Sequence, residues 1–136
     1  MSRTLIIVKP DGVERRLIGA VLSRFETKGL RLVAGDVRRI GVALAEEHYA
    51  EHAERPFFAD LVTFITRSPA FVGVLEGPDD TWKIVRLMMG PTNPAEAPPG
   101  TIRGDFGTDL GENLIHGSDS EASAQREIAL FFPDLG

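Results

Sequence analysis

Short strand-like runs alternate with segments of helical periodicity along the chain, and this alternation limits the fold more than any other feature of the sequence. Residues 4–8, Thr-Leu-Ile-Ile-Val, form an apolar run without a polar face, which is typical of a strand buried on both sides. Residues 30–40 alternate as a half-buried strand does, residues 70–75 form a second apolar run, and residues 113–116 indicate a short last strand. We therefore expect four strands.

Segments with apolar residues at helical spacing fill the intervals between these strands. Asp11 with Glu14 fits a capping box for a first helix that ends at Gly29, and Ser118 with Glu121 fits another for the last helix. Between them, the sequence predicts helices over residues 43–53, 57–66 and 80–89, the last with Asp79 and Asp80 as N-cap candidates. This order predicts an α+β sandwich in which one layer of helices packs on an antiparallel sheet.

Length and composition exclude several other classes of protein. The 136 residues predict a single domain over residues 1–136, and the absence of cysteine excludes a disulfide scaffold and a Cys-ligated zinc site. No apolar run approaches the ~20 residues of a membrane span, and the first strand begins where a secretory signal would lie, so we expect a cytoplasmic protein. The formal net charge of -5 argues against a nonspecific nucleic-acid binder.

The stretch from residue 90 to residue 117 lacks any sustained periodicity. It contains six glycines and four prolines. So long an irregular segment is uncommon inside a compact domain and usually serves a function. We therefore expect functional residues on it.

His116 is the first candidate for chemistry. It stands between the last strand and the last helix, whose free N–H groups and positive end favour an anion beside the imidazole. A neutral imidazole is a good nucleophile near pH 7 and can accept a phosphoryl group. The alternative is an ordinary turn histidine whose neighbours only cap the helix.

Three cationic residues are further candidates. Lys9 follows the first strand directly and precedes Pro-Asp-Gly, which suits a phosphate contact, although no Walker sequence is present. Arg86 lies late in a predicted helix, where a cation also suits the helix dipole. Arg103 lies in a glycine-rich segment that lets backbone approach a ligand, and the alternative is an ion pair with Asp105 or another acidic residue.

Five segments taken together resemble the nucleoside diphosphate kinase family, in register from about Thr4 to Phe132. They are Lys-Pro-Asp-Gly at 9–12, Arg-Pro-Phe-Phe at 55–58, Thr-Asn-Pro at 92–94, Pro-Gly-Thr-Ile-Arg-Gly-Asp-Phe at 99–106 and Asn-Leu-Ile-His-Gly-Ser-Asp-Ser at 113–120. The last segment is the most specific, and Lys-Pro-Asp-Gly alone would be weak evidence.

The resemblance implies a phosphotransferase with broad base specificity. By this similarity, His116 takes the γ-phosphoryl group of a nucleoside triphosphate and passes it to a nucleoside diphosphate, in a ping-pong cycle through phosphohistidine. Phe57 matches the residue that stacks on the base, and Leu61 and Leu110 match apolar positions of the same cleft. The positions that match phosphate and sugar contacts are Lys9, Tyr49, Arg86, Thr92, Arg103 and Asn113.

Several of these positions have plainer interpretations. Phe57 and Tyr49 also fit ordinary helix packing. Ser118 and Glu127 match residues that orient the catalytic imidazole, while Glu127 also fits a surface position. His52 matches a position that varies in the family and is only an additional candidate for a phosphate neighbour, and we assign His48 no role.

The resemblance also implies a cofactor, a fold and an assembly. Mg²⁺ would be held by the nucleotide phosphates and water, without protein ligands. The implied fold is a ferredoxin-like α+β sandwich with a four-stranded antiparallel sheet, in a homo-oligomer, either tetramer or hexamer, built from dimers. Pro91 and the Pro98–Pro99 pair depart from the family pattern and leave the size of the oligomer open. Two rival functions are a nucleotide-binding regulatory module without turnover and a single-stranded nucleic-acid binder.

Overall fold

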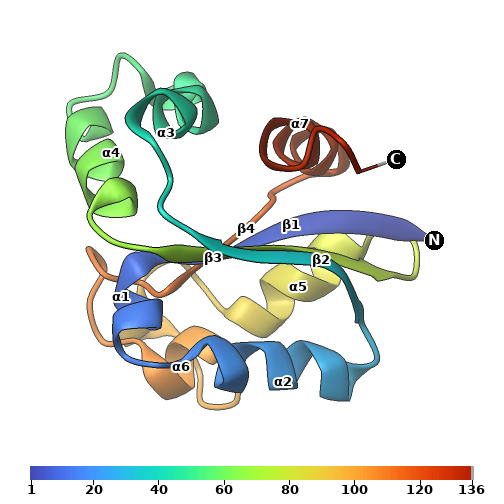
Figure 1. Cartoon of the computed structure of the whole chain (residues 1–136). Coiled ribbons are helices and arrows are strands. Elements are labelled where there is room, and N and C mark those ends of the chain that lie inside the picture. Colours follow the sequence, from blue (N-terminus) through green and yellow to red (C-terminus); the bar gives the residue numbers. More distant parts are fainter. Residues whose placement is uncertain (136) are drawn as a thin grey trace.

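A four-stranded antiparallel sheet forms the centre of the molecule. The computed structural model describes residues 1–135, and the strands are β1 (Ser2–Val8), β2 (Arg31–Arg38), β3 (Ala70–Gly77) and β4 (Ile115–Gly117), in the order β2-β3-β1-β4 (Figure 1). Every pairing is antiparallel. This confirms the ferredoxin-like arrangement expected from the sequence, with the central position taken by the two most apolar strands.

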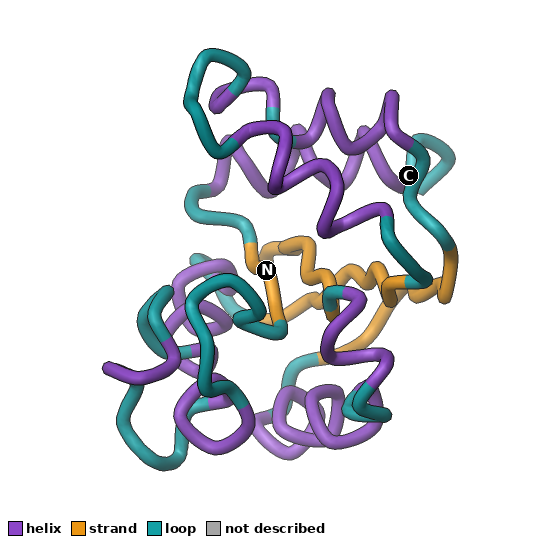
Figure 2. Tube along the Cα trace, turned by 90° about the vertical axis from the view of Figure 1, so that its left-hand side faces the viewer, coloured by secondary structure: helices purple, strands orange, loops and turns teal. Residues whose placement is uncertain are grey.

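Helices cover both faces of this sheet, so the expectation of one helical layer was wrong (Figures 1 and 2). Two separate apolar clusters result, one around Phe25 and Val85 and the other around Ile65 and Phe131. The cause is visible in β1, whose last five residues are all buried and supply side chains to both clusters. The helices are α1 (Pro10–Glu14), α2 (Ile18–Lys28), α5 (Thr81–Met89) and α6 (Ile102–Phe106) on one face and α3 (Val42–His48), α4 (Phe58–Thr66) and α7 (Glu121–Phe131) on the other.

The helix starts differ from those predicted by the capping patterns. The first helix is two helices, α1 and α2, separated at Arg16, whose φ is 61°. Asp11 lies inside α1, and its carboxylate accepts the backbone N–H of Leu114 at 3.0 Å. The helix α7 is capped by Ser120, whose hydroxyl accepts the N–H of Ser123, and not by Ser118. Each predicted cap is therefore used in a tertiary contact or displaced by a neighbour.

The start of α5 depends on a long-range contact, and α3 ends earlier than predicted. Asp80, the N-cap of α5, has a φ of 61° and makes no side-chain cap. The hydroxyl of Ser2 accepts the N–H of Thr81 at 3.0 Å in its place. The predicted helix at 43–53 ends at His48 and is followed by a 3₁₀ turn (Ala50–His52).

The stretch from 90 to 117 is more ordered than its composition indicates. It holds a 3₁₀ turn (Pro94–Glu96) and α6. The helix α6 is capped by Thr101, whose hydroxyl accepts the N–H of Gly104 at 3.0 Å. Within residues 1–135, no helix is both long and apolar enough to cross a bilayer.

Candidate active site

His116 is the central residue of β4, where it pairs with Ile7 of β1. Its side chain is 21 % exposed and lines a cavity of about 240 Å³. The cavity brings together residues from the ends of β1 and β4, from α3, α5, α6 and α7, and from the 90–117 stretch. The predicted site residues that line it are Lys9, Tyr49, Arg86, Thr92, Arg103, Asn113, His116 and Glu127.

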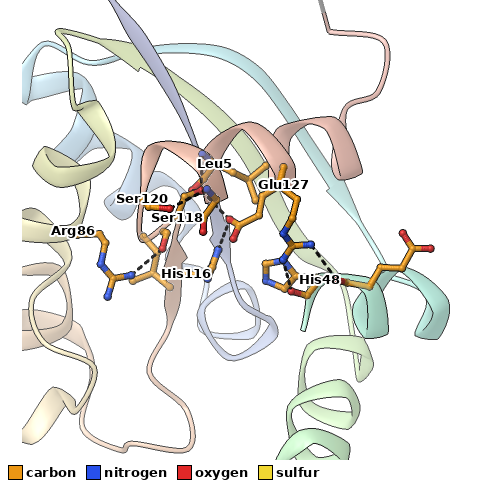
Figure 3. A network of polar contacts seen from close by, with 12 residues as sticks. Leu5, His48, Arg86, His116, Ser118, Ser120 and Glu127 are labelled. Atoms are coloured by element: carbon orange, nitrogen blue, oxygen red, sulfur yellow. Dashed lines mark hydrogen bonds and ion pairs between the residues drawn. The ribbon is translucent and has the colours of Figure 1, made fainter. Parts of the chain in front are cut away.

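The orientation of the His116 ring is set by Glu127 of α7 (Figure 3). The Nε2 atom of His116 lies 2.8 Å from Oε1 of Glu127, and the hydroxyl of Ser118 donates to the same oxygen at 2.8 Å. Burial would raise the pKa of Glu127, but His116 and Ser118 bring it below its ordinary value. Glu127 is therefore an ionised acceptor, which favours the tautomer of His116 that carries its proton on Nε2 and leaves the lone pair on Nδ1.

His48 packs against the His116 ring, although no role was expected for it from the sequence. The two ring centroids are 4.7 Å apart at an angle of 84°, an edge-to-face contact. Burial, and then the electrostatic interaction with the neighbouring His116 ring, lower the pKa of His48 to about 3. His48 therefore stays neutral and restricts the His116 ring without adding charge beside it.

Lys9 and Asn113 form a pair at the end of β1. The Nζ atom of Lys9 donates to Oδ1 of Asn113 at 2.8 Å, and Nδ2 of Asn113 donates to the carbonyl of Thr92 at 3.1 Å. Burial and then Arg103 lower the pKa of Lys9 to about 8, while Asp11 opposes the shift. The Lys9 ammonium is therefore a partly desolvated cation, which attracts phosphate more strongly than a solvated one does.

Arg103 is almost fully buried, and its guanidinium donates hydrogen bonds to backbone carbonyl groups. Its guanidinium donates to the carbonyls of Gly90 and Asn113, each at 3.1 Å, and to that of Ile115. Burial and then Arg86 lower its pKa to about 10, so it remains charged at neutral pH. The alternative of an ion pair between Arg103 and Asp105 does not occur, because Asp105 pairs with Arg24 at 2.7 Å.

Arg86 and Tyr49 complete the polar wall. Arg86 donates from Nη1 to the carbonyl of Gly117 at 2.9 Å, which places its guanidinium beside the strand that carries His116 (Figure 3). Burial raises the pKa of Tyr49 to about 12, so its phenol keeps its proton. Both side chains can donate hydrogen bonds to an anion in the cavity.

Three residues assigned to base binding lie outside the cavity lining. Phe57 precedes α4 and is 45 % exposed, with its ring centroid 5.6 Å from that of His52. Leu110 is 57 % exposed, whereas Leu61 is half-buried against the core beneath α3 and α4. Phe57 and Leu110 are thus available to an apolar ligand group, and the helix-core alternative for Phe57 does not account for its exposure.

Arg126 is a cavity residue that the sequence analysis missed. Its guanidinium donates to the carbonyls of Glu47 and His48 at 3.2 and 3.0 Å, which joins α7 to the end of α3. The helical spacing of Ser123 and Glu127 was the available signal, because residues three and four apart share a helix face. Ser123 also lines the cavity.

One group of side chains within residues 1–135 could hold a metal ion directly. Candidate ligand atoms of His48, His116 and Glu127 lie within 4.8 Å of one another. Two imidazoles and a carboxylate suit Zn²⁺ better than Mg²⁺, which prefers oxygen ligands. The exposed carboxylates of Glu51 and Asp119 also line the cavity and are oxygen ligands of the kind that Mg²⁺ prefers.

Comparison with known proteins decides the family of the chain. The sequence model of the family described as "Nucleoside diphosphate kinase" matches residues 2–135. The chain belongs to the nucleoside diphosphate kinase family. A nucleoside diphosphate kinase of Natronomonas pharaonis is 61% identical over 134 residues, which is 98% of this chain and 87% of that protein. One of Archaeoglobus fulgidus is 56% identical over 98% of this chain and 88% of its own.

Solved structures of the family agree with the fold. A halophilic nucleoside diphosphate kinase of Halobacterium salinarum, solved in complex with CDP, has a TM-score of 0.94 and 56% identity over 98% of this chain and 88% of its own. The apo enzyme of Encephalitozoon cuniculi has a TM-score of 0.95 and 41% identity, and the match covers 98% of this chain and 90% of that one. The chain is thus a phosphotransferase that moves phosphate between nucleotides.

Proposed function

We propose that this nucleoside diphosphate kinase works through a phosphohistidine at Nδ1 of His116, in a ping-pong cycle. The observation that carries the proposal is the 2.8 Å contact between Nε2 of His116 and the ionised Glu127. That contact occupies one ring nitrogen and leaves the other as a nucleophile on a ring that also lines the cavity.

The two half-reactions use the same groups in opposite directions. The Nδ1 lone pair attacks the γ-phosphorus, the bond from that phosphorus to the β,γ-bridging oxygen breaks, and the nucleoside diphosphate leaves. A β-phosphate oxygen of the second nucleotide then attacks the phosphorus, and the N–P bond breaks. Donor and acceptor are chemically alike, so the protein has mainly to position the groups and to stabilise charge on the transferred phosphoryl.

The cationic wall supplies that stabilisation. Lys9, Arg86 and Arg103 would face the polyphosphate, with Thr92 and Tyr49 as hydroxyl donors and Asn113 at the ribose. The loss of one such donor typically costs 10²–10³-fold in rate. Mg²⁺ would be held chiefly by the nucleotide phosphates and water, with the carboxylates of Glu51 and Asp119 in the same cavity, and it would offset the negative charge of the phosphates.

Broad base specificity follows from the position of Phe57. A half-exposed ring can stack on any base, because every base has an apolar face. Leu61 and Leu110 would border the same base. In Phe57→Ala we therefore expect affinity for adenine, guanine, cytosine and uracil nucleotides to fall by similar factors, measured by equilibrium binding; a loss limited to one base would contradict stacking as the mode of recognition.

The setting of the enzyme is also a proposal. We infer a cytoplasmic homo-oligomer, tetramer or hexamer, built from dimers: the resemblance to the family implies the assembly, and the lack of cysteine fits a reducing compartment. Mass measurement in solution distinguishes the two assemblies. A monomer at micromolar concentration would contradict both.

Labelling with γ-³²P-ATP and Mg²⁺ tests the mechanism. Wild-type protein should take up an acid-labile, alkali-stable phosphoryl group and release it when any nucleoside diphosphate is added. His116→Ala should take up none, whereas Asp60→Ala, which removes an exposed carboxylate outside the cavity lining, should label normally. Wild-type protein that binds nucleotide without labelling would favour the regulatory module.

A further inference from the structure

Leu114 lies between Asn113 and the strand that carries His116, in an unusual backbone conformation. Its φ is 77°, and the N–H of Ile115 donates to the carbonyl of Asn113 at 2.8 Å across it. This is a γ-turn with a positive central φ, the rare and strained form. Leu114 is also fully buried, so a branched apolar residue occupies a conformation that glycine adopts far more readily.

The turn is held from two sides. On one side, the N–H of Lys9 donates to the carbonyl of Leu114 at 2.9 Å, and the N–H of Leu114 donates to Oδ2 of Asp11 at 3.0 Å. On the other side, Arg103 donates to the carbonyls of Asn113 and Ile115, the residues that flank Leu114. Strained backbone persists when its surroundings determine it this strongly, and such sites cluster where function needs an imposed geometry.

Gly12 allows α1 to lie directly against the turn. A Cβ at Gly12 would lie 3.2 Å from the carbonyl oxygen of Leu114 and 2.8 Å from Cγ1 of Val8. The Asp11–Gly12 pair therefore presents a carboxylate to the turn while leaving room for its backbone. This accounts for Asp11, which was expected to cap a helix together with Glu14 and instead contacts the turn.

Asp11 lowers the stability of the fold at this position. It is 3 % exposed, and within residues 1–135 its Oδ1 atom has no hydrogen-bond partner. Burial raises its pKa, while Lys9 and neighbouring backbone N–H groups oppose the shift. A buried carboxylate with one oxygen unpaired costs stability, which indicates that the contact made by the other oxygen is retained for another reason.

We propose that Asp11 is a positioning residue for phosphoryl transfer: it fixes the strained turn at Leu114 and thereby sets the places of Asn113 and the His116 imidazole in the cavity. The inference rests on the proposed role of His116. Without the acceptor at Asp11, the turn can relax toward an unstrained conformation, and a shift of about 1 Å in a reacting group can cost about 10²-fold in rate.

Single-turnover kinetics of three variants test the proposal. Asp11→Asn keeps a side-chain oxygen for the Leu114 N–H and should form phosphohistidine within about threefold of the wild-type rate at saturating nucleotide. Asp11→Ala removes the acceptor and Asp11→Glu displaces it, and both should be slower by about 10- to 100-fold. Asp60→Ala removes an exposed carboxylate of α4 and serves as the charge-matched control.

Amide hydrogen exchange separates positioning from lost stability. In Asp11→Ala the Leu114 N–H should exchange faster, while the amides of Ile6 and Ile7 in β1 stay protected. Wild-type rates in Asp11→Ala with a deprotected Leu114 would overturn the proposal. So would a fast Asp11→Glu beside a slow Asp11→Asn, because charge and not geometry would then matter. Wild-type protein that forms no phosphohistidine would refute the proposed function instead, and the exchange result would still stand.

Discussion

At the scale of single residues, the buried imidazole of His48 links the chemistry of the cavity to the stability of the protein. Its side chain is 5 % exposed and contacts the rings of Tyr49, His116 and Phe131. Within residues 1–135, its Nδ1 atom has no hydrogen-bond partner. A proton on this ring would be buried among aromatic groups, which explains the low pKa.

His48 should therefore make the protein sensitive to mild acid. Its pKa is about 3 in the native state against 6.5 in the unfolded chain, so the unfolded state binds more protons between these values and stability falls as pH falls. One such group lowers the free energy of unfolding by ~1.4 kcal/mol for each pH unit of acidification, or by about 2 kcal/mol between pH 6.5 and pH 5. Urea unfolding at pH 7 and at pH 5 measures this loss of unfolding free energy. His48→Asn should lose about 2 kcal/mol less over this range, and an equal loss would assign the sensitivity to other groups.

Lys9 should limit activity on the alkaline side. Its pKa, lowered to about 8 by burial and then by Arg103, means that its charge is lost as pH rises through 8. Because kcat/KM reports the free enzyme, it should fall about tenfold per pH unit well above pH 8. Lys9→Met should have a lower plateau, by about 10²-fold, and no alkaline limb at this pH. If the alkaline fall of kcat/KM persists in Lys9→Met, another titrating group causes it.

At the scale of elements, the sequence predicted strands better than helix ends. The apolar runs of β1 and β3 are explicit in the residues, because a strand buried on both faces needs no information from elsewhere. Helix starts depend on tertiary contacts: Ser118 and Ser120 are both suitable caps, and the choice between them follows from Glu127, which binds the hydroxyl of Ser118. A local capping pattern therefore cannot predict which of the two serines caps the helix.

The position of α6 depends on one glycine. A Cβ on Gly104 would lie 1.9 Å from the carbonyl oxygen of Pro98, so Gly104→Ala must move α6 or the preceding loop. We expect a loss of about 3 kcal/mol of unfolding free energy and a raised KM for nucleotides, since Arg103 is the preceding residue. Gly19→Ala, where no atom lies within 4 Å, is the matched control and should keep wild-type stability and KM. An unchanged KM in Gly104→Ala would show that the position of α6 does not affect nucleotide binding.

At the scale of the whole molecule, the fold turns an acidic chain into a cationic cavity. The net charge is -5, yet the cavity is lined by Lys9, Arg86, Arg103 and Arg126. Lys9 and Arg103 lie in segments that resemble the family, and Arg86 matches one of its phosphate contacts, so the sequence indicated these three residues. Arg126 and His48 could not be predicted in the same way, since only the packing of α7 on α3 brings them to the cavity.

This distribution of charge should separate nucleotides from nucleic acids. A cavity of about 240 Å³ with a local cationic wall suits one polyphosphate, whereas a strand of nucleic acid needs a continuous basic groove, and the net charge of -5 repels it. At about 150 mM salt, fluorescence anisotropy of a labelled single-stranded oligonucleotide should stay unchanged at protein concentrations that saturate with Mg²⁺-nucleotide. Phe57→Ala is the control, because it should weaken nucleotide binding alone. Oligonucleotide binding that equals nucleotide binding and disappears in Phe57→Ala would show that the exposed ring serves nucleic acid.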